Sequence, residues 1–129
     1  MRFAIGSTDY RVNDQAQTMD TAAVIKEERT LLPIRYVATP LGASVDWKAE
    51  EKKAVISING KTIELRAGQN TALVNGVEVM IDPGNMNVSP EVVPPGRIIL
   101  PLRFIAENLG CEVEWDSDRR TVTVTGAKP

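Results

Sequence analysis

Four residues are the strongest candidates for binding chemistry, and they form two matching pairs. Arg35 and Arg103 fall in the first turns of expected helices, where a cation opposes the helix dipole. We expect a carboxylate or strand carbonyls to hold each guanidinium group, with an exposed anion site as the alternative. Trp47 and Trp115 end alternating strands whose pattern points both rings inward. Core packing is therefore expected, and a half-exposed ring that stacks on a sugar is the alternative.

Catalytic chemistry has little support, because the sequence contains no histidine. Ser–His and Cys–His mechanisms need imidazole, and copper and catalytic zinc sites depend largely on it. The single cysteine, Cys111, matches Ala43 in a similar stretch and should be buried and unreactive. Glu112 and Glu114 lie two residues apart on one expected strand, so both should face solvent. We expect no catalytic residue, no metal and no cofactor.

The candidate residues recur because two stretches of the chain are similar. RTLLPIRYVATPLGASVDW, residues 29–47, aligns without a gap with RIILPLRFIAENLGCEVEW, residues 97–115, and nine of nineteen positions are identical. A weaker match joins residues 5–20 to residues 67–82. A repeat of this length indicates two copies of one folding unit. We predict copies at residues 1–60 and 61–129 that share one compact, pseudo-symmetric domain.

Each copy should contain one short helix among strands. Pro33 and Pro101 suit the first helical position, where no N–H is required. Gly42 and Gly110 suit left-handed C-terminal caps. Pro40 should shorten or bend the first helix. The order in each copy is hairpin, strand, helix, strand, strand, and the fold class is α+β: a duplicated unit of mainly antiparallel strands with one short helix per copy packed on the sheet.

Short turn motifs mark the expected hairpins. Asn-Gly at residues 59–60 and 75–76 supplies the positive φ angles of a two-residue turn, and Asn13-Asp14 is a weaker equivalent. The second copy has six additional residues between Asp82 and Pro90. This exposed loop, residues 83–89, is either a specificity element or a tolerated insertion.

Bulk properties limit the partners. A net charge of −2 and a pI near 5.2 argue against nucleic acid or an anionic membrane surface. No stretch approaches the roughly 20 apolar residues of a membrane span. The segment MRFAIGSTDY lacks the apolar region of a signal peptide, so we expect a cytoplasmic start or an excised segment.

These motifs resemble the copper amine oxidase N-terminal-like domain, also called a stalk domain. The matching patterns are G-x-x-x-Y-x-V-N-D from Gly6, R-T-L-L-P-I-R-Y-V-A from Arg29 and L-G-A-x-V-x-W from Leu41, and related patterns recur in the second copy. The resemblance implies a helix packed on antiparallel sheet and an extracellular or cell-wall setting, as an excised module of a larger surface protein. True copper amine oxidases use three copper-ligating histidines and a tyrosine-derived quinone on a separate catalytic domain, so this chain cannot carry that site.

The expected function is that of a non-catalytic cell-surface module, acting as a spacer or interaction domain. The alternative is a binding module for cell-wall glycan or another polysaccharide, so partners would be wall polysaccharide or other modules of the parent protein. A carboxylate-based hydrolase is a remote alternative that needs two carboxylates about 5–10 Å apart in a cleft. The exposure of four aromatic residues separates the first two functions, because fully buried rings could not stack on a sugar: Tyr36, Trp47, Phe104 and Trp115.

Overall fold

The structure, a computed structural model, describes residues 1–58, 60–94 and 96–125. The strands form three sheets, and every pairing among the described residues is antiparallel. Two short helices accompany them, so the fold is α+β with more strand than helix. No helix in the described ranges is long and apolar enough to cross a membrane.

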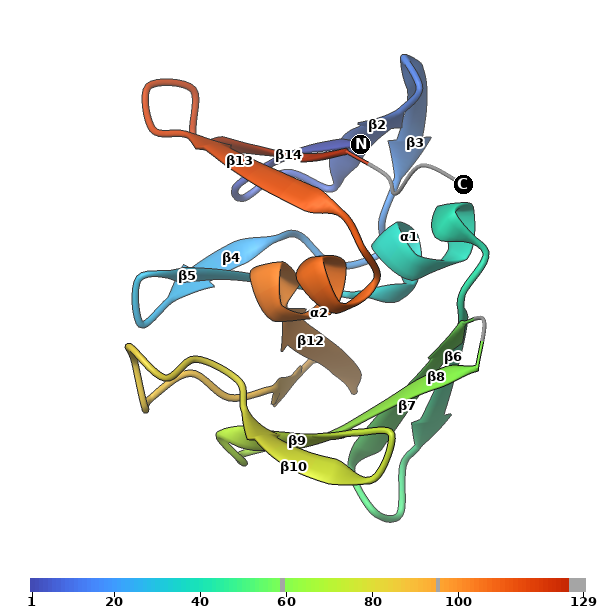
Figure 1. Ribbon diagram of the computed structural model, residues 1–129. Helices are drawn as coiled ribbons and strands as arrows, with labels where there is room; N and C mark the ends of the chain where they lie inside the picture. The colour runs from blue at the N-terminus through green and yellow to red at the C-terminus, as the bar shows by residue number, and fades with distance from the viewer. Residues whose placement is uncertain (59, 95, 126–129) are drawn as a thin grey trace.

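Two five-stranded sheets have corresponding strand orders. One runs β13 (Glu112–Asp116), β14 (Thr121–Thr125), β1 (Arg2–Ala4), β2 (Asp9–Val12), β3 (Gln15–Thr18). The other runs β6 (Ser44–Lys48), β7 (Lys53–Ile58), β8 (Lys61–Arg66), β9 (Thr71–Val74), β10 (Val77–Met80). Each sheet therefore combines strands from before and after residue 60. Figure 1 shows the two sheets on opposite sides of the helices.

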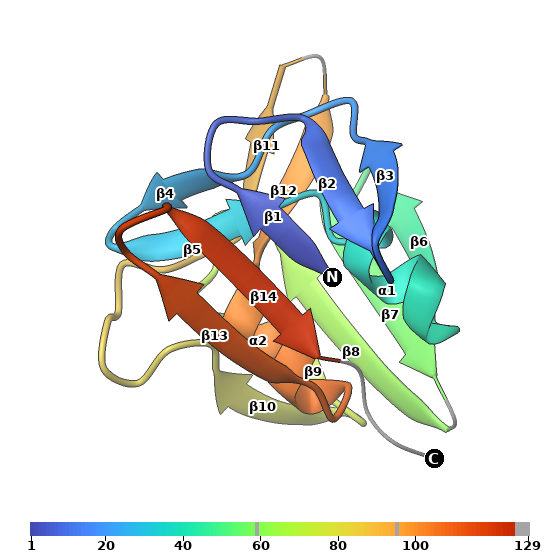
Figure 2. The ribbon, with the colours of Figure 1, turned by 90° about the horizontal axis from the view of Figure 1, so that it is seen from above.

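The strand register is the same in both of these sheets. Phe3 lies opposite Val122, and the residues that align with them, Leu65 and Ala54, also lie opposite each other. Figure 2 shows β1 beside β14, the pair that corresponds to the β7–β8 hairpin. The predicted boundary between copies falls within this hairpin, and the division at residues 1–60 and 61–129 stays a prediction.

A four-stranded sheet joins the two halves of the chain. Its order is β11 (Glu91–Val93), β12 (Arg97–Pro101), β5 (Arg29–Leu32), β4 (Val24–Lys26). Leu32 of β5 lies opposite Leu100 of β12, and these two residues are aligned in the sequence. Since an antiparallel pair has a local twofold axis between opposed residues, that axis passes between two matching leucines. The short strands β4 and β11 were not predicted.

The two helices differ in length. α1 (Arg35–Ala38) continues as the 3-10 helix η1 (Thr39–Leu41), whereas α2 (Leu102–Asn108) has seven residues. Pro40 lies in η1 and cannot donate the next helical hydrogen bond, which accounts for the short α1.

The helix ends differ slightly from the sequence prediction. Pro101 is the N-cap residue of α2, and Pro33 precedes the N-cap of α1, so neither proline occupies the first helical position. The prediction was wrong by one or two residues, and Pro101 has an extended backbone that ends β12. Gly42 and Gly110 follow the helices with φ of 88° and 84°, the left-handed conformation that a C-terminal cap requires.

The tight turns are partly as predicted. Asn13-Asp14 and Asn75-Gly76 have positive φ and connect paired strands, whereas Asn59 lies outside the described residues. Glu27 and Glu28 also have positive φ, an uncommon conformation for these residues, in the β4–β5 turn. The β10–β11 connection has ten residues, 81–90, against five, 19–23, between β3 and β4. Five of the six additional residues are therefore placed there.

The core fills the space between the three sheets. Each helix contributes an apolar stripe that follows from the i, i+3, i+4 spacing of its apolar residues, with Val37 and Ala38 from α1 and Ile105 and Ala106 from α2 at 0% exposure. The central leucines of β5 and β12 join the same apolar cluster. One continuous core thus contacts both helices, and the surface around each helix can be compared directly.

Candidate functional site

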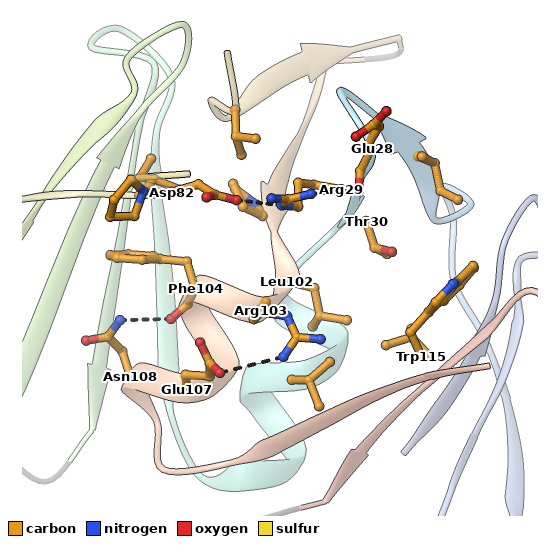
Figure 3. A pocket seen from close by; sticks show the side chains of 17 residues that line it. Glu28, Arg29, Thr30, Asp82, Leu102, Arg103, Phe104, Glu107, Asn108 and Trp115 are labelled. Atoms are coloured by element: carbon orange, nitrogen blue, oxygen red, sulfur yellow. Dashed lines mark hydrogen bonds and ion pairs between the residues drawn. The ribbon is translucent and has the colours of Figure 1, made fainter. Parts of the chain in front are cut away.

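A pocket of about 570 Å³ lies beside α2. Its walls come from α2, β13, the β4–β5 hairpin and the connection at residues 81–88. In Figure 3, Phe104 and Trp115 lie on opposite sides of the pocket, and charged side chains lie between them. The volume falls in the range of pockets that hold small-molecule ligands, roughly 300–1,000 Å³.

Trp115 is 42% exposed, so the prediction that its ring packs in the core is wrong. Val113 and Trp115 of β13 both line the pocket, so the face that was expected to point into the core borders the pocket at Trp115. Trp47, Tyr36 and Phe104 are partly buried. All four aromatic residues are therefore at least partly exposed to solvent, so the sugar-binding alternative is not excluded by burial.

The helix arginines are not held as predicted. Arg103 pairs with Glu107 one turn along α2, with 3.7 Å between Nη1 and Oε2, and both side chains are more than half exposed. Arg35 is exposed, and its side chain makes no hydrogen bond or ion pair within the described residues, although its charge helps to lower the pKa of Asp20. In each first turn the apolar side chains face the core, whereas the arginine side chain faces solvent. Of the four predicted binding residues, Arg103 and Trp115 line the pocket, and Arg35 and Trp47 lie outside it.

Two other arginines form ion pairs between distant segments of the chain. Arg29 Nε donates to Asp82 Oδ2 at 2.5 Å in the wall of the pocket. Arg97, which aligns with Arg29, donates from Nε to Asp20 Oδ2 at 2.7 Å. Each pair joins a residue before position 60 to one after it. Sequence reasoning missed these pairs, although all four residues recur in the two alignments.

The two ion pairs have different surroundings. The side chains of Arg29 and Asp82 are 38% and 21% exposed, against 44% and 42% for Arg97 and Asp20. The hydrogen bond from Arg97 is the main reason that the pKa of Asp20 lies below its ordinary value, with smaller contributions from the Tyr36 hydroxyl and the charge of Arg35. The backbone N–H of Asp20 donates to the Tyr36 hydroxyl oxygen at 3.3 Å.

Hydrogen bonds fix the loop that forms one wall of the pocket. The Asn85 side-chain amide donates to the Glu27 carbonyl at 2.7 Å, and the Gly84 N–H donates to Asp82 Oδ1 at 3.1 Å. Val88 is 2% exposed and anchors the end of the loop in the core. The additional residues of the chain therefore build part of the pocket wall, which the sequence indicated only as one of two alternatives.

Residues that could support catalysis are placed unfavourably. Cys111 is buried, as predicted, and Glu112 and Glu114 are exposed. Of the pocket carboxylates, Asp82 and Glu107 are each paired with an arginine. No group of three metal-ligating side chains of the His, Cys, Asp or Glu type comes together in the described ranges.

Comparison with protein families gives one match, to the copper amine oxidase N-terminal domain. The family model matches residues 1–38 and residues 11–124, so the two overlapping matches cover almost the whole chain. The resemblance inferred from the sequence motifs is thereby confirmed. Comparison with curated proteins and with solved structures gives no significant match.

Proposed function

The chain belongs to the copper amine oxidase N-terminal domain family, and from this premise we propose that it is a non-catalytic, stalk-like module that acts as a spacer or interaction domain. The observation that carries this proposal is the use of its repeated charged residues. Arg29–Asp82 and Arg97–Asp20 bind distant segments of the chain to each other. Such contacts favour a module whose repeated residues maintain its shape.

We infer further that the module arose by tandem duplication. Support comes from three correspondences: the aligned sequences, the matching strand registers and the reciprocal ion pairs. In this interpretation the two copies exchange strands, since β6 and β7 pair with β8–β10. Neither copy then has a complete sheet alone, and the two halves fold as one unit.

A cell-surface or cell-wall setting is also part of the proposal. Its support is the resemblance to stalk domains, and the partners would be other modules of a larger surface protein or wall polysaccharide. Co-sedimentation with isolated bacterial cell walls, at low and high salt, tests it. A protein that stays in the supernatant favours the spacer, with its contacts inside the parent protein. Salt-resistant pelleting that soluble wall glycan competes away makes the chain a glycan-binding module.

Saccharide binding is the second candidate function, and one observation favours it. Trp115 is 42% exposed at the edge of a pocket that Phe104 lines from the other side. A partly exposed indole that faces a pocket offers an apolar surface on which the apolar face of a sugar ring can stack. The spacer needs no such ring, so this exposure distinguishes the two candidates.

A further inference from the structure

We propose that the pocket beside α2 binds a neutral saccharide of one or two rings, with Trp115 as the stacking platform. This inference rests on the second candidate function and assigns it a place and a ligand class. The pocket volume of about 570 Å³ suits a ligand of that size. A second hollow of about 190 Å³, lined by Arg2, Asp116 and Arg119, borders the same tryptophan. A saccharide can therefore contact the ring and extend along it.

The charges around the pocket favour a neutral ligand. Arg29 is paired with Asp82, and Arg103 is paired with Glu107, so both cations are already matched. Glu28 adds one further carboxylate at the rim. An anionic ligand would meet three carboxylates, and it would have to displace Asp82 or Glu107 to reach an arginine. A neutral ligand leaves both ion pairs intact.

The polar groups of the pocket favour a ligand with many hydroxyl groups over a purely apolar one. Each paired guanidinium retains further N–H donors, and each paired carboxylate retains lone pairs. The Thr30 hydroxyl and the Asn108 amide also line the pocket. An apolar ligand would remove these groups from water without replacing their hydrogen bonds, at a cost in binding free energy. Hydroxyl groups both donate and accept, so they can satisfy this mixed set.

The pocket is preorganised, which lowers the entropic cost of binding. Asn85 fixes the loop wall through the Glu27 carbonyl, and the Arg29–Asp82 pair joins that wall to β5. The Asn108 amide is held by a 2.8 Å hydrogen bond to the Phe104 carbonyl. A ligand therefore enters a site whose walls are already in place.

The two tryptophans provide the test and its internal control. The chain has only two tryptophans, so their indole N–H signals in a ¹H–¹⁵N spectrum are assigned with Trp47→Phe and Trp115→Phe. The probes are N,N′-diacetylchitobiose, cellobiose and maltose, with galacturonic acid dimer and glucosamine dimer as charged controls. At least one neutral disaccharide should shift the Trp115 signal saturably and leave the Trp47 signal unchanged. Because Trp115→Ala lacks that indole, its binding is followed through backbone N–H signals; it should be about tenfold weaker, whereas Trp47→Ala should bind as the wild type does.

Several results would overturn the proposal. The proposal would be refuted if no neutral probe shifted the Trp115 indole signal at its solubility limit. It would also be refuted if Trp115→Ala and Trp47→Ala lost equal binding affinity. Stronger binding of a charged dimer would refute the neutral ligand. If the chain pellets with cell walls and Trp115→Ala pellets equally well, the glycan-binding function stands and the pocket assignment falls. If the wild-type chain neither pellets nor binds a probe, both fall and the spacer remains.

Discussion

The surroundings of α1 and α2 are built from aligned residues but differ at the surface. We define the α1 side as α1, β6 and the Arg97–Asp20 pair, and the α2 side as α2, β13 and the Arg29–Asp82 pair. On the α1 side, the Tyr36 hydroxyl accepts a hydrogen bond from the Asp20 backbone, and Trp47 is half-buried. On the α2 side, Phe104 lacks the hydroxyl, and Trp115 lies exposed at a pocket.

Three local differences account for this contrast. Phenylalanine at position 104 cannot make the contact of Tyr36, the proline at position 40 shortens α1, and the longer β10–β11 connection adds a wall to the α2 side. The opposed leucines at the centre of the four-stranded sheet are the same residue type in both aligned stretches. A shared core is therefore kept while a few surface positions create a pocket beside α2.

The largest expected effect tests the shared core. Leu32→Ala and Leu100→Ala each remove a side chain with 0% exposure from opposed positions. If the two sides are equivalent at the core, each variant should lose about 2–5 kcal/mol of unfolding free energy, and by similar amounts. Urea unfolding measures both losses. Leu73→Ala, at a residue 37% exposed, serves as the control and should change little.

A smaller change in unfolding free energy is expected at the aligned positions 36 and 104, where the two sides have different residues. Tyr36→Phe makes the α1 side resemble the α2 side and removes the acceptor of the Asp20 N–H. The loss should be about 0.5–1 kcal/mol, the usual net value of one hydrogen bond. Phe104→Tyr is the matched reverse variant and should gain no stability. An equal gain from Phe104→Tyr in thermal unfolding would show that the two sides are more alike than the structure indicates.

The coupling free energy of the two ion pairs should be smaller where their side chains are more exposed. Double-mutant cycles with alanine should give a coupling near 1 kcal/mol for Arg29–Asp82 and less for the more exposed Arg97–Asp20. Raising the salt concentration should weaken the exposed pair more, because solvent screens it better. A larger coupling free energy for Arg97–Asp20 than for Arg29–Asp82 would contradict this prediction.

The smallest effect is a pH dependence that belongs to the α1 side. The pKa of folded Asp20 is below its ordinary value of 3.8, mainly through the Arg97 hydrogen bond. This carboxylate therefore stabilises the fold at neutral pH, and its contribution is lost as the pH falls below about 4. Arg97→Gln should raise the Asp20 pKa toward 3.8 in a ¹³C NMR titration. An unchanged pKa would mean that Arg97 is not its cause.

The sequence predicted the parts of the fold that depend on local patterns. The helix stripes, the glycines after the helices and two of the tight turns follow from residue spacing. The pairing of strands from the two halves of the chain within one sheet could not be predicted, because apolar alternation shows which face is buried but not which strand lies beside it. The same limit hid the Arg29–Asp82 pair, whose partners are separated by 53 positions.

The candidate site was predicted in part. Trp115 and Arg103 were selected from their recurrence and do line the pocket. The burial of Trp115 was wrong, because strand alternation gives the direction of a side chain and not whether another element covers it. The sequence marked Phe104 only as one of four aromatic residues whose exposure matters. Its position opposite Trp115 depends on how α2 packs beside β13, which the sequence does not show.

The contrast between the two sides is tested most directly by the accessibility of the two tryptophans. Single-tryptophan variants, Trp47→Phe and Trp115→Phe, report on one side each through acrylamide quenching of their fluorescence. Trp115, at 42% exposure, should be quenched more strongly and should emit at longer wavelength than half-buried Trp47. Equal quenching, or stronger quenching of Trp47, would contradict an open pocket on the α2 side and would remove the basis for saccharide binding there.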